Sequence, residues 1–490
     1  MRRNFKSIFL IIVCGVVACA AISHVFKSWR TKQLQREIAD IRRTLHEQGF
    51  KTELDDFKIT TDAAMRARVA ALTALGDEPK LNINGDVLVF QPVVSNGVAS
   101  VLWKQEALSL GTKPYQWADL RAALNKEQVR LDAACDAALS GPFRSDMNPS
   151  YSTHYWNDTI SSFDQVSRTL SYRVILKIHD GNLDAAWTNL LAVTRLVTAW
   201  EVEPAFAAHL IRATIANGAS AVTWQALQFN HWPDDRLATL QSEWESPDYF
   251  TNFPEVMGLQ RVDTDHRCQR WLLNPPEVDF PVSHIANILF KDPSSALKEA
   301  GYDYQAARYR GNKVLTDEKN LLLYYRDREL ELRHAIQSPI WTQMRAQPGI
   351  TNPPPFKSPW NEMAYSISFD SSLSSQLMAV AAVSEAQRRI LVTAIALERY
   401  HGKHGSYPNS LASLSPEFLK TVPVDFMDGQ PLRYRPTSDG HFLLYSVGLD
   451  CMDDGGKAPA PDALRFGSFE HGKFVVPKHV DIVWPVPAGP

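Results

Sequence analysis

AQRRILVTAIALERYHGKHGSYPNSLASL (residues 386–414), PVDFMDGQPLRYRP (423–436) and HFLLYSVGLDCMDDGG (441–456) are the stretches that decide the fold of the C-terminal region. Apolar residues recur at helical spacing and predict a helix over residues 372–400, which leads into a Tyr407-Pro408 corner. Asp428-Gly429 is a turn signal. The two short β-like runs that follow it end in a loop rich in Gly and Asp. These stretches predict a small αβ module.

The order of motifs in this region resembles that of a known family. Residues 387–456, or 387–482 with the tail, look like the globular domain of the major pseudopilin of type II secretion systems. That family has a Gly-x-Tyr-Pro corner, a Pro-x-Asp turn and a Leu-Tyr-Ser-x-Gly-x-Asp loop. The counterparts here are Tyr400, Gly405, Tyr407, Pro408, Leu411, Leu414, Pro423, Asp425, Asp428, Gly429, Pro431, Tyr434, Leu444, Tyr445, Ser446, Gly448 and Asp450.

The acidic loop after the second β-like run is a candidate cation site. Asp450, Asp453 and Asp454 fall within five residues beside glycines, and carboxylates with turned-in carbonyls suit a hard cation such as calcium. An acidic solvent-exposed turn explains the same residues. The resemblance implies calcium binding, with Asp450 as the first ligand, Asp453 or Asp454 as the second, and Asp481 closing the site.

The helix before Tyr400 differs from the membrane-embedded helix of a pseudopilin. It carries Gln376, Glu385, Arg388 and Arg389. These side chains predict a helix that does not span a membrane. We therefore expect no polymerisation into a secretion pseudopilus.

The N-terminus predicts attachment to a membrane. A basic start is followed by residues 8–22, IFLIIVCGVVACAAI, which carry no charge. With residues 23–26 this run approaches the roughly 20 residues needed to cross a bilayer. We expect a signal anchor at residues 1–27, single-pass in the inner membrane, with the bulk of the chain outside. A signal peptide cut among the small residues 18–21 and a lipoprotein acylated at Cys19 are the alternatives.

Residues 28–50 predict a stalk helix. Leu34, Ile38, Ile41 and Leu45 recur at the spacing of a coiled-coil seam, and Gly49 ends the pattern. The seam is explained equally by packing against the same chain and by self-association.

Residues 51–345 predict a mainly helical body with a short β-like segment at 81–103. The strongest helical block is 164–227, and its junction at residues 180–182 resembles the turn of a tetratricopeptide-type hairpin. A helical scaffold and a peptide-binding groove both fit this block. A Pro-rich linker at 346–371 leads to the C-terminal domain, 372–490. The predicted fold class is α+β: an anchor helix, a helical body and a small pseudopilin-like αβ domain.

Composition limits the function classes. The 490-residue chain has a formal net charge of −3, which gives no basic surface for nucleic acid. Five scattered cysteines form no disulfide or zinc pattern. The sequence holds no G-x-S-x-G, phosphate-binding Gly loop or H-E-x-x-H. His401 and His404 are explained by helix capping.

These limits favour a non-enzymatic envelope protein in binding or assembly, with an unidentified protein partner and a secretion-related setting implied by the resemblance. The alternative is an extracytoplasmic enzyme with its active site in the Trp-rich body, residues 103–345. An enzyme predicts a polar cleft there with perturbed carboxylates or histidines.

Overall fold

The computed structural model describes residues 2–57, 60–75, 94–95, 98–110, 113–146, 153–229, 232–273, 309–354, 356, 373–458, 468–470, 473–475 and 477–487. The chain divides into two compact units. The first holds Met1–Phe57, Pro254–Leu330 and Pro354–Ser371, and the second holds Lys58–Phe253, Glu331–Pro353 and Ser372–Pro490. Helices dominate and the strands are short, so the α+β class is confirmed at that coarse level.

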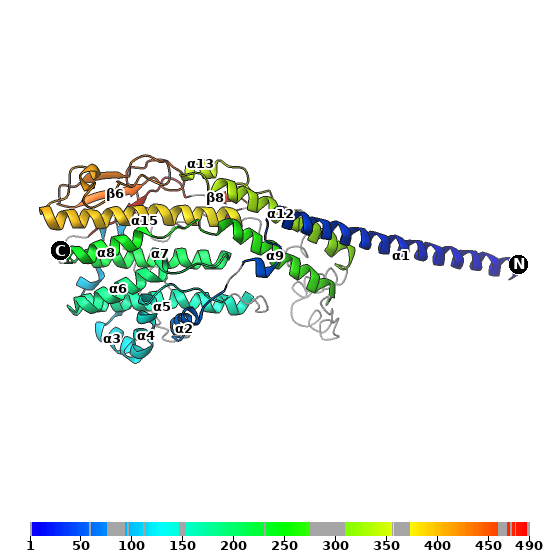
Figure 1. The fold of residues 1–490 in the computed structure, drawn as a ribbon, viewed down its shortest axis with the longest axis horizontal. Coiled ribbons are helices and arrows are strands. Elements are labelled where there is room, and N and C mark those ends of the chain that lie inside the picture. The colour runs from blue at the N-terminus through cyan, green and yellow to red at the C-terminus, as the bar shows by residue number, and fades with distance from the viewer. Residues whose placement is uncertain are drawn as a thin grey trace. The chain divides into compact units, whose positions relative to one another are not determined.

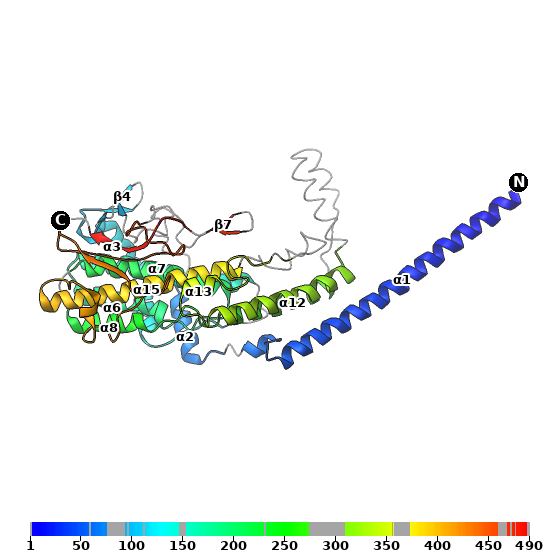
Figure 2. The same cartoon turned by 90° about the horizontal axis from the view of Figure 1, so that it is seen from above.

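In the first unit, the predicted anchor and stalk lie on one continuous helix, α1 (Arg2–Glu47). Gly49, at φ +78°, follows its end. Leu34 and Ile38 of the seam pack with Leu315 and Leu322 of α12 (Asn312–Ala335), which runs beside the end of α1 in Figure 2. The seam is thus filled within the chain. No helix in the described part of the chain is both long and apolar enough to cross a membrane.

A buried ion pair joins the helices of the first unit. Arg261 of α9 (Phe253–Leu273) donates to Glu329 of α12 at 2.6 Å, and their side chains are 1% and 3% exposed. Arg261 also donates to the carbonyl of Lys51, at 2.8 Å. One guanidinium therefore holds α9, α12 and the segment after α1 together.

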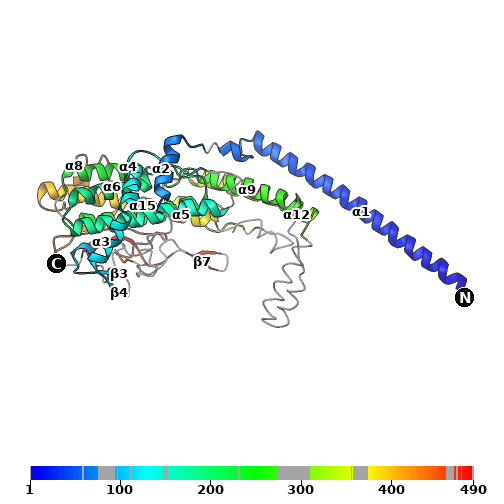
Figure 3. The ribbon, with the colours of Figure 1, turned by 90° about the horizontal axis from the view of Figure 1, so that it is seen from below.

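The second unit contains a helical bundle in which α5, α6 and α7 pack against one another and α4 packs against α2 and α6 (Figure 3). Gly181, at φ +72°, and Asn182, which caps α6 by accepting from the amide of Ala185, make the predicted turn between α5 and α6. The bundle helices are α2 (Ala63–Thr73), α3 (Trp117–Lys126), α4 (Gln128–Leu139), α5 (Thr153–His179), α6 (Leu183–Thr198), α7 (Phe206–Leu227) and α8 (Asp234–Glu245).

The long C-terminal helix α15 (Leu373–His404) lies along α7 and α8 of the same unit (Figure 1). Every residue from Leu377 to Ala382 is buried, so the helix is apolar around its whole circumference there. Such a helix needs covering on more than one side. The helical body covers it, and residues 372–490 share a compact unit with 58–253.

The C-terminal sheet is antiparallel, in the order β5-β6-β9, and β6 and β9 pack on α15. Leu444 pairs with Tyr434 on one side and Trp484 on the other. Beyond β9, β10 pairs in parallel with β2 of the body, which ties the tail to the bundle. The strands of these two sheets are β1 (Val94–Ser95), β2 (Val98–Ala99), β5 (Arg433–Pro436), β6 (Phe442–Ser446), β9 (Ile482–Trp484) and β10 (Val486–Pro487).

Two hairpins and four short helical segments complete the elements of the described residues. They are β3 (Leu108–Leu110), β4 (Lys113–Tyr115), β7 (Ser468–Glu470), β8 (Lys473–Val475), η1 (Leu54–Phe57), η2 (Leu102–Lys104), η3 (Leu411–Leu414) and α13 (Trp341–Arg345). Most of the predicted β-like segment at 81–103 and of the linker at 346–371 lies outside the described residues.

Candidate functional site

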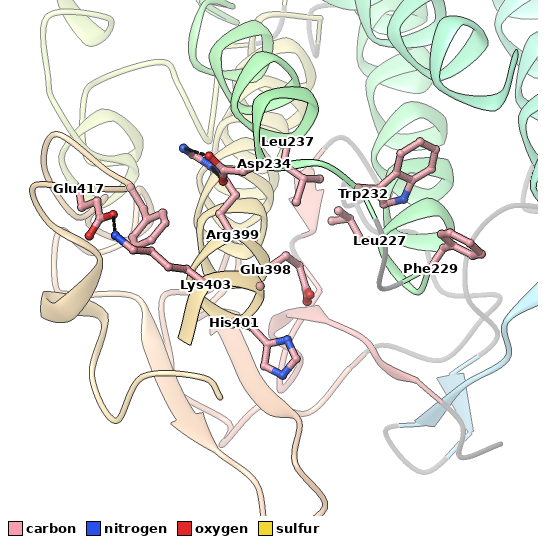
Figure 4. Close-up of a pocket in the computed structure, with 12 residues that line it drawn as sticks. Leu227, Phe229, Trp232, Asp234, Leu237, Glu398, Arg399, His401, Lys403 and Glu417 are labelled. Carbon is pink, nitrogen blue, oxygen red and sulfur yellow. Dashed lines mark hydrogen bonds and ion pairs between the residues drawn. The ribbon is translucent and has the colours of Figure 1, made fainter. Parts of the chain in front are cut away.

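A cavity of about 420 Å³ lies within the second unit, where the end of α7, the start of α8 and the last turns of α15 meet. Its volume is in the range of small-molecule sites. The residues after α15, Glu417 and Phe418, complete its wall. The helical body and the C-terminal module both contribute side chains to it (Figure 4).

One wall of the cavity is apolar and aromatic. Leu227, Phe229, Trp232 and Leu237 line it. Phe229 makes edge-to-face contacts with Trp232, at 6.2 Å between centroids, and with Trp103, at 5.7 Å. The indole N–H of Trp232 donates to the carbonyl of Ala226 at 2.7 Å. The polar atom of the ring is therefore satisfied within the protein, and the ring lines the cavity as an apolar surface.

The cations of the cavity are already paired. Arg399 donates to both carboxylate oxygens of Asp234, at 2.8 and 3.1 Å, and this contact lowers the pKa of Asp234. Lys403 pairs with Glu417. Both cations also lie over the Phe418 ring, at 5.4 and 5.9 Å from its centroid. Their charges are therefore neutralised within the protein.

Glu398 has no such cation. Its described hydrogen-bond partner is the Tyr407 hydroxyl, which donates at 2.8 Å, and no described residue forms an ion pair with it. The residue is half-buried, and burial raises the pKa of its carboxyl to about 7, against the opposing effect of the Tyr407 hydrogen bond. In Figure 4, Lys403 extends toward Glu417, while Glu398 lies on the opposite side of α15.

His401 borders the same part of the cavity, one helical turn after Glu398. Its ring stacks on Tyr407 with 4.5 Å between centroids and 25° between planes. Burial, followed by the nearby His441, lowers the pKa of His401. His401 is therefore neutral at neutral pH and offers the cavity a hydrogen-bonding ring without a charge.

Asp450, Asp453 and Asp454 lie in the loop after β6, and Asp481 stands directly before β9. Hydrogen bonds occupy most of the oxygens of these predicted calcium ligands. Asp481 accepts from the backbone amides of Asp454, Gly456 and Lys457, at 3.4, 2.8 and 3.2 Å. Asp450 accepts from the amides of Met452 and His479, at 3.2 and 3.0 Å. These carboxylates close the loop by accepting backbone N–H groups.

Asp453 is engaged as well. It accepts from Tyr445 and from the amide of Gly455, both at 3.0 Å, and from Arg433 at 3.4 Å. Asp454 has one buried oxygen, Oδ2, without a hydrogen-bond partner. Within the described residues, no three His, Cys, Asp or Glu side chains come together as a metal site. Calcium binding at this loop stays a prediction.

Calorimetry of the whole chain in detergent micelles tests the calcium prediction. If calcium binds here, Asp450→Ala removes the heat of calcium binding because it deletes the first ligand. Asp439→Ala, at an exposed carboxylate in the β5–β6 turn, is the matched control and retains the heat. No calcium heat in the unmodified protein, or a heat that Asp450→Ala leaves unchanged, contradicts the prediction.

Glu398 was not predicted from sequence, although a signal for it exists. Leu391, Ala394 and Ile395 are buried on α15, and Glu398 continues their spacing along the helix. A carboxylate on a buried stripe indicates either a structural partner or a site. Its neighbours Phe229 and Trp232 come from a distant part of the chain, which the helical pattern cannot indicate.

Comparisons with known protein families, with curated proteins and with solved structures found no match to this chain. The function is therefore argued from the site and the sequence pattern.

Proposed function

We propose that this chain is a membrane-tethered envelope protein that binds a ligand or partner at the cavity of its second unit. The single observation that carries the binding role is the cavity itself, which joins an aromatic wall to the unpaired carboxylate of Glu398. A site of this composition orients a ligand through a few polar groups. The tether rests on the basic start and the uncharged run at residues 8–22.

The pseudopilin-like motif order supports an envelope location and a secretion-related setting. The burial of α15 against α7 and α8 supports a role other than filament building, because a pseudopilus would need that helix for contacts between subunits. A protein partner in assembly remains part of the proposal.

Cell fractionation tests the tether. We expect the full chain in the membrane pellet of bacterial cells, released by detergent and retained after a high-salt wash, since hydrophobic burial resists salt. Deletion of residues 1–27 moves the protein to the soluble fraction. Cys19→Ser is the control and leaves the protein in the membrane, unless a lipid on Cys19 is the anchor. Recovery of the full chain as soluble cytoplasmic protein contradicts the proposal.

An extracytoplasmic enzyme is the second candidate, and the raised pKa of Glu398 favours it. A carboxyl with a pKa of about 7 in a cavity suits general acid–base chemistry. This group comes from α15, outside the predicted active-site region at 103–345, whereas Leu227–Leu237 of the wall lie inside it. Turnover that Glu398→Gln abolishes, without loss of the fold, would favour the enzyme over the binding protein.

A further inference from the structure

We propose that the cavity around Glu398 binds an organic cation, an ammonium or guanidinium group carried on an apolar body. The inference deepens the proposed binding role and rests on it. An amine from a small molecule and a Lys or Arg side chain from a partner protein supply the same chemistry.

The charges of the cavity give the first argument. Among the described residues that line it, Arg399 pairs with Asp234 and Lys403 pairs with Glu417. Glu398 is left with a hydroxyl donor and no positive charge. A carboxylate removed from water is stabilised strongly by an opposite charge at short range, and the described residues provide none here. A ligand cation would supply it.

The aromatic wall gives the second argument. Phe229 and Trp232 stand on the same side of α15 as Glu398 (Figure 4), and the Trp232 N–H already has an acceptor. Aromatic ring faces attract ammonium and guanidinium groups by cation–π interaction, and the ring carbons pack against the apolar part of the ligand. The same chemistry operates inside the protein, where Arg399 lies over Phe418. An anionic ligand finds no such complement, because both cations of the cavity are paired.

The arrangement makes binding dependent on pH. The cation needs the charged form of Glu398, so affinity is full above a pH of about 7 and is lost as the pH falls through that value. Around Glu398, the titratable and charged groups are Asp234 from α8, Arg399, His401 and Lys403 on α15, and Tyr407 and Glu417 after α15. His401 becomes protonated as the pH falls, and its positive charge repels a bound cation. This effect weakens binding at low pH, as protonation of Glu398 does.

Calorimetry of the full chain in uncharged detergent tests the proposal with phenethylammonium as the probe. We expect binding at pH 8.5 that weakens about 30-fold at pH 5.5, the ratio that a single carboxyl with a pKa of about 7 gives. The neutral analogue 2-phenylethanol and the anion 3-phenylpropionate should bind at least about 10-fold more weakly. Nα-acetyl-lysine amide and Nα-acetyl-arginine amide form the second arm, and tighter binding of these assigns the cation to a protein partner.

Variants separate the role of Glu398 from general structural effects. Glu398→Gln keeps an oxygen acceptor for Tyr407 and should weaken the probe about 10- to 100-fold at pH 8.5, with an unchanged melting curve. Glu243→Gln is the matched control, because Glu243 pairs with Arg195 away from the cavity, and it should retain the affinity. Tyr407→Phe removes the donor that favours the charged form and should move the midpoint of the pH dependence upward.

The result of the cation-binding experiment is independent of the result of the fractionation experiment on the membrane tether. A folded protein that binds no cation at pH 8.5, or binds 2-phenylethanol equally well, overturns the cation proposal and leaves membrane attachment standing. Unchanged affinity in Glu398→Gln overturns it as well. A soluble protein that binds the probe in the predicted way contradicts the tether alone.

Discussion

Replacing Asp425 by alanine is expected to lower the free energy of unfolding by about 3–5 kcal/mol, because the change leaves several buried donors without an acceptor. The Asp425 residue is fully buried. Its carboxylate accepts from Ser446 at 2.6 Å, from the amides of Met427 and Val447 at 2.9 and 3.0 Å, and from Arg433 at 3.2 Å. One side chain therefore connects the turn before β5 to the end of β6.

Chemical denaturation of the full chain measures this effect. The control is Asp439→Ala, an exposed turn carboxylate hydrogen-bonded to Thr437 and to the amide of His441, for which we expect a change below about 1 kcal/mol. The loss of unfolding free energy in Asp425→Asn should lie between those of Asp425→Ala and Asp439→Ala, because the amide keeps one acceptor oxygen and replaces the other with an NH2 donor. If Asp425→Ala changes the free energy of unfolding as little as Asp439→Ala does, the role of Asp425 as the acceptor for these buried donors is contradicted.

The second large effect is expected at the buried pair of the first unit. Arg261→Met should lower the free energy of unfolding by about 3–5 kcal/mol, because it removes the guanidinium that pairs with the buried carboxylate of Glu329 at 2.6 Å. The loss of the hydrogen bond to the carbonyl of Lys51 adds to this cost. Arg43→Met, at an exposed pair with Asp40, is the matched control and should change stability by less than about 1 kcal/mol.

A double variant separates the pair from simple packing. Arg261→Met combined with Glu329→Met removes both charges, and we expect it to be more stable than Arg261→Met alone. A double variant that is less stable than the unmodified protein by the sum of the two single-variant effects would show that the two charges act independently. Denaturation curves of the four proteins in one buffer measure the coupling.

Local patterns in the sequence predicted the helices and turns well. Gly181 and Asn182 end one helix and cap the next, as their turn chemistry predicts. The β-like runs after Asp428-Gly429 form β5 and β6. These features depend on neighbours in sequence.

Features that depend on distant partners were not predicted. Residues Leu34 and Ile38 indicated a seam without naming α12 as the element that fills it. The pattern of α15 indicated burial without showing that α7 and α8 cover it. The acidic loop shows the same limit, since the spacing of Asp450 and Asp453 carries no information on the backbone amides that their oxygens accept.

The unpaired carboxylate of Glu398 is the central claim, and the most direct test is a carbon-13 NMR titration of glutamate side-chain carboxyls in the full chain. Glu398→Gln identifies the signal. We predict one carboxyl that titrates with a pKa of about 7 and disappears in that variant, and that moves to lower pH when phenethylammonium is added. A Glu398 signal that titrates near the ordinary glutamate pKa of about 4.3 would contradict the claim.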